Sequence, residues 1–388
     1  MQSGTVRALA PPQSGKTAVV RPAKPSLWVW VPFVWLFIVS TRALSTWLNL
    51  AGHTSLTADP EMSGSPVDSV LLATLMALGL IVLFTRAERA KRLLFRNKWL
   101  LVLFAYMAIS TAWSNFPDVT IRRWIRSAGT LVMVLVIHTE DNPLGALKAL
   151  LRRVYLLYIP ASIAAIKYFR NIGVTFDWSG SEEMWIGLSV HKNNLGQVAM
   201  CSGLFSTWQI LQNWSRKKLT LDLLVLLLTF WLLRGSKNSH SSTAILGFLV
   251  STMILIALQF TRKRAARAKR IVLTSVVVAA LLIPCVYVSF QAFGTTPVDL
   301  VLQATGRDLT LTDRTLLWAD ILHNAAKSPI VGVGFGAFWV GNHGYQLYVM
   351  ENWDKKTPEW RPNEGHDGYI DVFIDLGAIG VVLVLIVI

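Results

Sequence analysis

Long apolar runs recur along this chain, and they constrain its fold more than any other feature of the sequence. A helix of about 20 apolar residues matches the thickness of the hydrocarbon layer of a bilayer, so we expect an all-α, polytopic membrane protein with about ten transmembrane helices. The composition agrees, because 53% of the 388 residues are hydrophobic and 15% are charged, whereas about 25% of a soluble domain is charged. The expected spans are 27–50, 68–85, 99–113, 125–139, 154–168, 193–211, 219–233, 242–260, 271–290 and 368–388.

The basic residues predict the orientation of these spans, because cytoplasmic loops carry an excess of Lys and Arg. If the N-terminus is cytoplasmic, 22 of the 37 Lys and Arg residues fall in short segments on the inside. Those segments are 1–26, 86–98, 140–153, 212–219 and 261–270. Short basic runs beside the membrane are typical of topological anchoring. The net charge of +15 therefore does not indicate a nucleic-acid partner.

The same orientation divides the chain into four regions. Residues 1–26 are polar and basic and are predicted to form a disordered cytoplasmic tail, and residues 27–290 contain the first nine transmembrane helices. Residues 291–367 form one long loop on the periplasmic or extracellular side, and residues 368–388 form the last transmembrane helix. We expect the first apolar run to be a retained anchor, because no small-residue cleavage site follows it.

Two glycine motifs and two cysteines point to no cofactor. "QSGKT" at 13–17 resembles the end of a P-loop, but Ala10 stands where the first glycine is needed. "VGVGFGAF" at 331–338 lies outside, with no acidic residue at the distance that a nucleotide site requires, so its glycines are expected to let backbones pack closely at the membrane surface. Cys201 and Cys285 lie in apolar runs and form no metal or disulfide pattern. We therefore expect neither a cofactor nor a metal.

The outer loop contains a predicted amphipathic helix. Its apolar residues with helical spacing are Trp318, Ile321, Leu322 and Ala325. Thr312 or Asp313 can cap its start, and Ser328-Pro329 ends it. Arg314 then lies in the first turn, where free N–H groups and the guanidinium fork both suit a phosphate. Taken alone, Arg314 is better interpreted as a solvated surface residue.

Further cations are predicted on the same outer side. They are Arg122, Arg123, Arg126, Lys192, Arg234 and Lys237. The orientation rule disfavours positive charge outside, so a cluster of exceptions suggests a bound anion. A lipid-linked pyrophosphate is the anion expected at that surface.

The stretch "NEGHDGYIDVFIDLG" at 363–377 places a histidine and three aspartates where the last span begins. His366 is predicted at a helix N-terminus, whose dipole favours the neutral ring, and a neutral histidine beside a carboxylate is a competent general base. The alternative is a loop histidine without a role. Asp367, Asp371 and Asp375 are spaced four apart on one face. Because charges at membrane depth are costly, they are expected to hold His366 or nearby cations in place.

At this point the chain resembles a known family. The pairing of "GRDLTLTDRTLLW" and "SPIVGVGFGAFW" with "HDGYIDVFIDLGAIG" resembles the signature of the O-antigen ligase and polymerase superfamily. The stretches "AISTAWSNFPDVTIRR" and "WIGLSVHKNNLG" also resemble family segments, in the expected order. The resemblance covers roughly 100–388, and the branch it favours is that of succinoglycan-type exopolysaccharide polymerases.

The resemblance implies a membrane glycosyltransferase of the GT-C-like type in the bacterial inner membrane. Such enzymes take a glycan from undecaprenyl pyrophosphate and attach it to an acceptor hydroxyl, without a metal. By this resemblance His366 is the catalytic base and Arg314 binds pyrophosphate. Lys237 stands where many members have Arg, and Asp367 stands where Asn is commoner. The proposed pyrophosphate ligands are Arg314, Arg122, Arg123, Lys192 and Lys237, and the supporting residues are Asp371, Asp375, Arg307 and Asn193. Members usually have about two spans after this motif, so the chain is expected to be truncated or to have an atypical end at Ile388.

Three functions remain in competition. The leading one is a polymerase that extends a lipid-linked polysaccharide, and the second is a ligase that transfers a finished glycan to a lipid A core. A transporter or flippase is the third, but it is expected to show internal repeats and broken helices at mid-span, and no repeat is found. The expected partners are the lipid-linked glycan donor, a glycan or lipid-linked acceptor, membrane lipids, and other polysaccharide assembly and export proteins.

Overall fold

The structure is a computed structural model, and it describes residues 24–50, 64–176, 182–212, 219–236, 240–261, 271, 274–275, 314–340 and 364–388. Its regular elements are almost all helices, in agreement with the all-α prediction. The exception is a short antiparallel pair of strands, β1 (Val174–Phe176) and β2 (Glu183–Trp185), which the sequence analysis did not predict. In chain order the helices are η1 (Leu27–Val29), α1 (Trp30–Ser40), α2 (Leu44–Leu50), α4 (Pro66–Thr85), α5 (Ala87–Arg96), α6 (Lys98–Ile109), η2 (Ser110–Ala112), α7 (Pro117–His138), α8 (Pro143–Tyr168), α9 (Arg170–Gly173), α10 (Lys192–Gln212), α11 (Leu219–Arg234), α12 (Ser242–Thr261), α15 (Arg314–Ala325) and α17 (Gly368–Val387).

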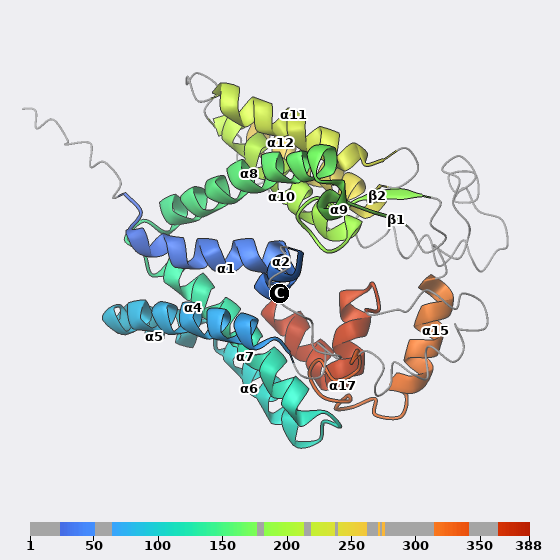
Figure 1. The fold of residues 1–388 in the computed structure, drawn as a ribbon. Coiled ribbons are helices and arrows are strands. Elements are labelled where there is room, and N and C mark those ends of the chain that lie inside the picture. The colour runs from blue at the N-terminus through green and yellow to red at the C-terminus, as the bar shows by residue number, and fades with distance from the viewer. Residues whose placement is uncertain are drawn as a thin grey trace, which may run out of the picture.

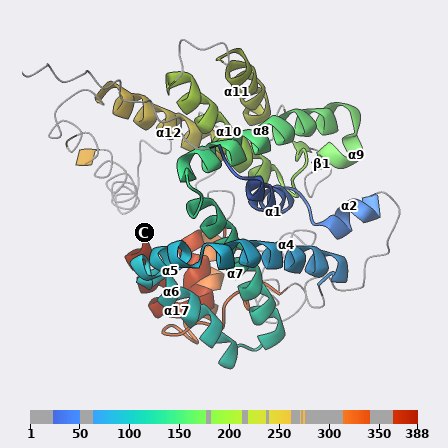
Figure 2. The same cartoon turned by 90° about the vertical axis from the view of Figure 1, so that its left-hand side faces the viewer.

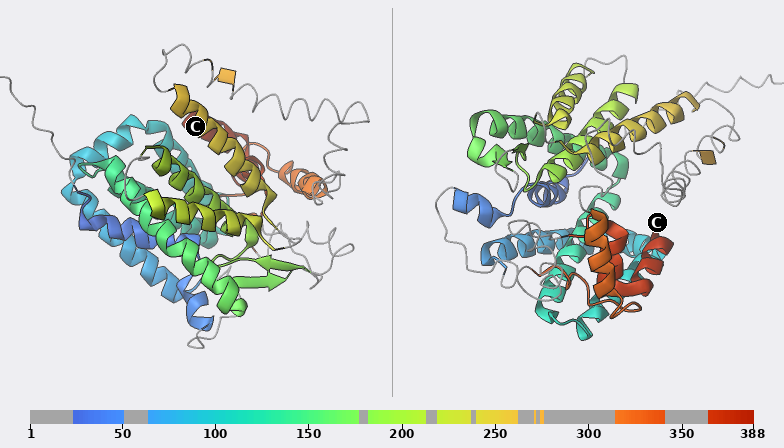
Figure 3. Two further views of the ribbon diagram at one scale, coloured as in Figure 1. Left: turned by 90° about the horizontal axis from the view of Figure 1, so that it is seen from above. Right: turned by 90° about the vertical axis from the view of Figure 1, so that its right-hand side faces the viewer.

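The helices form two groups with α1 between them (Figures 1 and 2). One group contains α8, α10, α11 and α12, and the other contains α4, α5, α6, α7 and α17; the right-hand view of Figure 3 shows the same separation from the opposite side. α1 contacts α8 on one side and α4 and α7 on the other. Because α6 packs on α17 and α15 packs on α17, the second group carries the segment around His366.

Proline marks the start of three helices. Pro66, Pro117 and Pro143 each occupy the first position of their helix, where the missing N–H costs nothing and the fixed φ suits the helix. At the start of α8 the Asn142 side chain also accepts a hydrogen bond from the Gly145 N–H at 2.9 Å. α7 therefore begins eight residues before the span predicted at 125, and α8 begins eleven residues before the span predicted at 154. The cations in these added residues lie within helices, whereas they were predicted in loops.

Four helices are long and apolar enough to cross a membrane, in the parts of the chain that the structure describes. They are Pro66–Thr85, Pro143–Tyr168, Ser242–Gln259 and Gly368–Val387, and a fifth results if the bent pair α5 and α6 counts as one span. The expected count of about ten is not reached among these residues. The predicted span 271–290 and most of the loop 291–367 lie outside the described residues.

The first predicted span, 27–50, is not a continuous helix. It is broken between α1 and α2, and Arg42 at the break is only 8% exposed. The Arg42 side chain donates to the Ser189 carbonyl at 3.1 Å and to the Ile172 carbonyl at 2.6 Å, and lies 5.5 Å from the Trp47 ring centroid. These contacts offset the cost of burying a charge, and they join the α1–α2 break to the segment before α10.

A second buried polar link joins α8 to α11. The Tyr155 hydroxyl donates to Asp222 Oδ1 at 2.7 Å, and Arg152 Nη2 lies 3.7 Å from the same oxygen. Asp222 is 3% exposed, so its carboxylate depends on both partners. The sequence analysis placed Arg152 in a loop, whereas the early start of α8 brings it into the helix.

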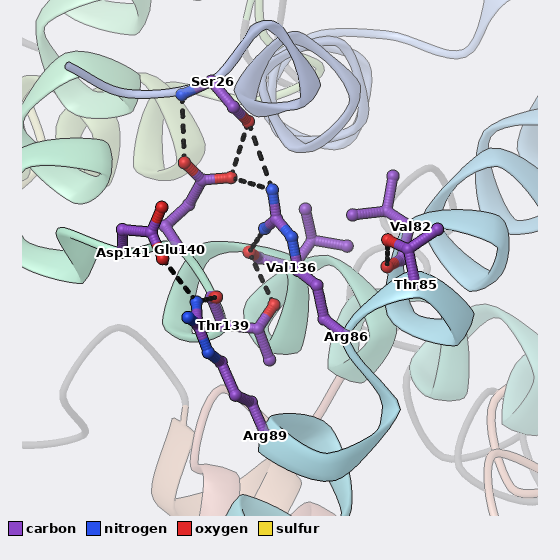
Figure 4. A network of polar contacts seen from close by, with 9 residues as sticks. All are labelled: Ser26, Val82, Thr85, Arg86, Arg89, Val136, Thr139, Glu140 and Asp141. Atoms are coloured by element: carbon purple, nitrogen blue, oxygen red, sulfur yellow. Dashed lines mark hydrogen bonds and ion pairs between the residues drawn. The ribbon is translucent and has the colours of Figure 1, made fainter. Parts of the chain in front are cut away.

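Hydrogen bonds connect the segment that follows α7 to Ser26, near the first residue that the structure describes. Ser26 donates to the Glu140 carboxylate from its backbone N–H (2.9 Å) and its hydroxyl (2.6 Å), and Arg86 Nη2 lies 2.6 Å from Glu140 Oε1 (Figure 4). Burial opposes ionisation of Glu140, but these hydrogen bonds outweigh it and hold its pKa below the ordinary value. Ser26, the last residue of the predicted tail, is therefore bound to the segment between α7 and α8.

Candidate functional site

The site is built on a small apolar cluster formed by α15, the loop that follows it and α17. α15 contributes Leu317, Ile321 and Ala325, all at most 3% exposed, and they pack with Phe338 and Ile374. The predicted amphipathic helix is therefore confirmed, with its start at Arg314. One apolar residue was assigned wrongly: Leu322 is 43% exposed, and Leu317 is buried instead. The buried positions 317, 321 and 325 follow an i, i+4, i+8 spacing, which places Leu322 outside the stripe.

α17 is broken at Gly377, where φ is 64° and ψ is −167°. The carbonyls freed before the break accept hydrogen bonds from other segments: the Val333 N–H donates to Ile374 O at 3.0 Å, the Gly334 N–H to Asp375 O at 2.9 Å, and the Tyr106 hydroxyl to Leu376 O at 3.1 Å. Backbone polar groups at membrane depth need such partners, because no water is available there.

The N–H groups freed after the break donate hydrogen bonds to the loop that follows α15, residues 326–340. Ala378 donates to Pro329 O at 2.9 Å, and Ile379 donates to Ile330 O at 3.3 Å. The last span was predicted as one continuous helix at 368–388, whereas α17 is broken at Gly377.

The glycines of "VGVGFGAF" are needed for this close approach. Gly332 has a φ of 70°, and a Cβ on it would lie 2.4 Å from the backbone of Asp375. A Cβ on Gly377 would lie 2.2 Å from Ile330 O. The expectation that these glycines let backbones pack closely is confirmed, and the partner backbone is that of α17.

Asp375 links the loop to α7. Its Oδ2 accepts a hydrogen bond from the Gly336 N–H at 2.8 Å, while Arg123 Nη1 donates to the Gly336 carbonyl at 2.6 Å. Both backbone groups of Gly336 are therefore bound, one by a carboxylate and one by a guanidinium. The predicted supporting role of Asp375 takes this form: it holds the loop against α17 and brings it close to Arg123.

The backbone that leads into His366 is held from two sides. The Gly365 N–H donates to Asp371 Oδ1 at 2.9 Å, and the Gly365 carbonyl accepts from the Trp318 ring N–H at 2.7 Å. The Trp339 ring N–H also donates to Asp371 Oδ1, at 3.0 Å. Asp371 thus connects α17, the loop and the residue before His366.

His366 lies directly before α17. Asp367 caps this helix by accepting from the Tyr369 and Ile370 N–H groups at 2.9 and 3.1 Å, so the predicted helix start is confirmed. His366 has a φ of 54°, a conformation that costs a residue other than glycine about 1–3 kcal/mol and is found mostly at functional sites. Its side chain is 18% exposed, and its Nδ1 lies 2.8 Å from Glu364 Oε1.

Glu364 and His191 are the two site residues that sequence reasoning missed. The carboxylate beside His366 belongs to Glu364, not to one of the three aspartates, and its place two residues before the histidine in "NEGHDG" was the available signal. His191 lies within electrostatic range of this pair. Partial loss of water around the ring lowers the pKa of His191, as do the charges of Lys192 and His366, while Glu364 raises it.

The same region of the chain is recognised by comparison with known proteins. A family model described as O-antigen ligase matches residues 223–385, which include α15, the loop and the His366 segment. The exopolysaccharide production protein ExoQ of Rhizobium meliloti (strain 1021) is 24% identical over 291 residues, which is 74% of this chain and 62% of that protein. In this region the chain is similar to the O-antigen ligase and polymerase superfamily. It spans less than two thirds of the length of this curated relative. No solved structure matches it.

The structure describes the side chains of only some of the remaining cations that the superfamily resemblance singled out. Arg314 begins α15, but its side chain lies outside what the structure describes, as do Lys237 and Arg307. Arg122 is exposed on α7, one position from Arg123. These residues stay predictions as pyrophosphate ligands.

Lys192 and Asn193 stand at the start of α10. The Asn193 N–H donates to His191 Nδ1 at 3.3 Å, and the charge of Lys192 acts on the same ring. Lys192 also lines a small pocket with Trp185 and His240. The start of α10 is thereby brought into electrostatic range of His366, as expected if both serve one site.

Proposed function

We propose that the protein is a membrane glycosyltransferase that extends polysaccharide chains from lipid-linked oligosaccharide repeats, with undecaprenyl pyrophosphate as the lipid carrier. The observation that carries this proposal is the Glu364–His366 contact of 2.8 Å on a backbone clamped by Asp371 and Trp318. Similarity to the superfamily supports the reaction class, and similarity to the exopolysaccharide production protein of Rhizobium meliloti supports the polymerase branch.

In the proposed reaction His366 is the general base. Its Nδ1–H donates to Glu364, which leaves the Nε2 lone pair to accept the proton of the acceptor hydroxyl. The acceptor oxygen forms a bond to the anomeric carbon of the donor sugar as the bond from that carbon to the phosphate oxygen breaks. The electron pair of the broken bond leaves with the pyrophosphate. A base of this kind contributes roughly 10²–10⁴-fold to the rate.

The cations are assigned to the leaving group. A pyrophosphate departs readily once its charge is balanced, so no acid is needed on that side. Arg314 at the start of α15 combines a guanidinium fork with free helix N–H groups, which is a suitable site for a phosphate. Lys192 and Arg122 supply further positive charge in the same region, and each is expected to contribute less to pyrophosphate binding than Arg314 does.

A ligase is the second candidate, because the matching family model is described as O-antigen ligase. The two enzymes share the chemistry above and differ in the acceptor: a ligase transfers the finished glycan to a lipid A core, and a polymerase adds it to another lipid-linked chain. The glycan that accumulates when the gene is deleted separates the two acceptors.

The test is to delete the gene and restore it with the wild type, His366→Ala or His323→Ala, at matched protein level in the membrane. For a polymerase, deletion abolishes long chains and leaves single repeats, and His366→Ala lowers chain elongation by at least about a hundredfold because the base is lost. His323 is an exposed histidine on α15, so His323→Ala is a matched control that keeps normal chain length.

Two outcomes contradict the proposal. Accumulation of unattached, full-length lipid-linked polymer after deletion identifies a ligase. Normal elongation by His366→Ala removes the base from the mechanism, whichever acceptor is used.

A further inference from the structure

α5 is a short helix whose polar and apolar residues are sharply separated. Ala90 faces inward and packs with Val82 and Val136 in a small apolar cluster. Lys91, Arg92 and Arg96 are exposed, and none of them has a carboxylate partner among the residues that the structure describes. The helix therefore presents three uncompensated cations at the edge of the molecule.

The direction of α5 differs from that of the adjoining helix. α5 and the α6–η2 segment meet at an angle of 86°. The apolar composition of α6 suits the interior of a bilayer, whereas Lys91, Arg92 and Arg96 do not, since each charge at membrane depth costs at least about 2.5 kcal/mol. If α6 crosses the membrane, α5 lies along its surface.

Two ion pairs hold α5 in this direction. Arg86, immediately before the helix, pairs with Glu140 at 2.6 Å, and Arg89 on its first turn pairs with Asp141 at 2.7 Å (Figure 4). Both acidic residues lie between α7 and α8. The start of α5 is thus held by the segment between α7 and α8, while Lys91, Arg92 and Arg96 follow further along the helix.

Exposed aromatic residues lie on α5 and on the helices that precede and follow it. Phe84 on the last turn of α4 is 79% exposed, Phe95 on α5 is 67% exposed, and Trp99 on the first turn of α6 is 45% exposed. The Lys98 ammonium lies 5.9 Å from the Trp99 ring centroid. Aromatic rings beside cations are typical of the boundary between lipid headgroups and acyl chains.

We propose that α5 is an interfacial helix that binds the phosphates of anionic phospholipids through Lys91, Arg92 and Arg96, with Phe95 inserted among the acyl chains. On the helix surface Lys91 and Arg92 flank Phe95, so a phosphate can be held on each side of the inserted ring. The occupant is a lipid because the cations and the exposed rings share one short surface, and only a headgroup with attached acyl chains satisfies both.

The test measures which lipids remain bound to the intact protein. The full chain is purified in detergent, equilibrated with equal amounts of phosphatidylglycerol and phosphatidylcholine, and examined by native mass spectrometry. The wild type is expected to retain mainly phosphatidylglycerol. The triple variant Lys91→Gln, Arg92→Gln, Arg96→Gln should lower the ratio of bound phosphatidylglycerol to phosphatidylcholine by at least about fivefold, since each surface cation contributes measurably to such binding.

Two further variants make the result specific. The double variant Arg92→Lys, Arg96→Lys keeps the positive charge of α5 and serves as the control, so it should leave the lipid ratio within about twofold of wild type. Glu88→Gln removes an exposed carboxylate from α5 and should raise the ratio, which misfolding cannot imitate. Equal ratios for wild type and the α5 triple variant, or an equal loss in the control variant, overturn the proposal.

Discussion

At the residue scale, the contacts around His366 separate two kinds of acidic residue. Asp371 and Asp375 bind backbone N–H groups of Gly365 and Gly336, so they hold segments in place. Glu364 contacts the imidazole itself. The carboxylates predicted as one stripe with one purpose therefore have different tasks, and the one closest to the chemistry lies outside the stripe.

We predict that Glu364→Gln slows glycan transfer by about tenfold or more, because the amide cannot stabilise the imidazolium that forms as His366 takes the proton. This interaction strengthens only in the transition state, so kcat should fall while KM for the acceptor stays near its wild-type value. Transfer kinetics in isolated membranes measure both. A rise in KM with unchanged kcat would show that Glu364 binds substrate and does not support the base.

The second prediction at this scale concerns Arg314. Arg314→Ala should abolish transfer, and Arg314→Lys should restore it only in part, because Lys keeps the charge but loses the bidentate fork. Arg122→Ala and Lys192→Ala serve as comparisons with smaller expected effects. The measurement is the rate of chain elongation at matched protein level. Normal elongation by Arg314→Ala would remove this residue from the pyrophosphate site.

At the element scale, the break in α17 depends on the glycine at its centre. Gly377→Ala places a Cβ 2.2 Å from Ile330 O at a φ of 64°, and the unfavourable φ alone costs about 1–3 kcal/mol. We predict a markedly lower yield of folded protein and a lower Tm in detergent. Gly368→Ala, also in α17, meets no atom within 4 Å and should behave as wild type. Equal Tm values for the two variants would show that the break is not required.

Some of these elements could be predicted from sequence and others could not. Helical spacing predicted α15, and the glycine before His366 predicted the start of α17, because both signals are local. The break at Gly377 could not be read from an apolar run, since it is stabilised by Val333, Gly334 and Tyr106 from distant segments. The β1–β2 pair was not predicted because strands of three residues are too short to show an alternating pattern in the sequence.

At the scale of the whole molecule, sequence motifs indicated the family resemblance and the candidate site segment, but not the contacts that position this segment. Arg42 joins the first predicted span to the segment before α10, and no motif predicted this contact. Its partners are backbone carbonyls, which carry no residue-specific signal. For the same reason Arg123 was predicted from its charge, whereas its contact with the Gly336 carbonyl required the structure.

Orientation across the membrane is the whole-molecule property on which the proposed function depends, because lipid-linked glycans are polymerised on the outer face. Asp118, exposed on the first turn of α7, lies on the helix whose Arg123 contacts the loop beside α17, and Ala87 is exposed on α5. In a Cys201→Ser, Cys285→Ser background we predict that Asp118→Cys reacts with an impermeant thiol reagent in spheroplasts and Ala87→Cys does not. Ser110 is a poorer position, because it is buried and its hydroxyl accepts from the Phe335 N–H. Labelling of Ala87→Cys alone would invert the topology and place His366 in the cytoplasm, where the proposed donor and acceptor are not expected to meet.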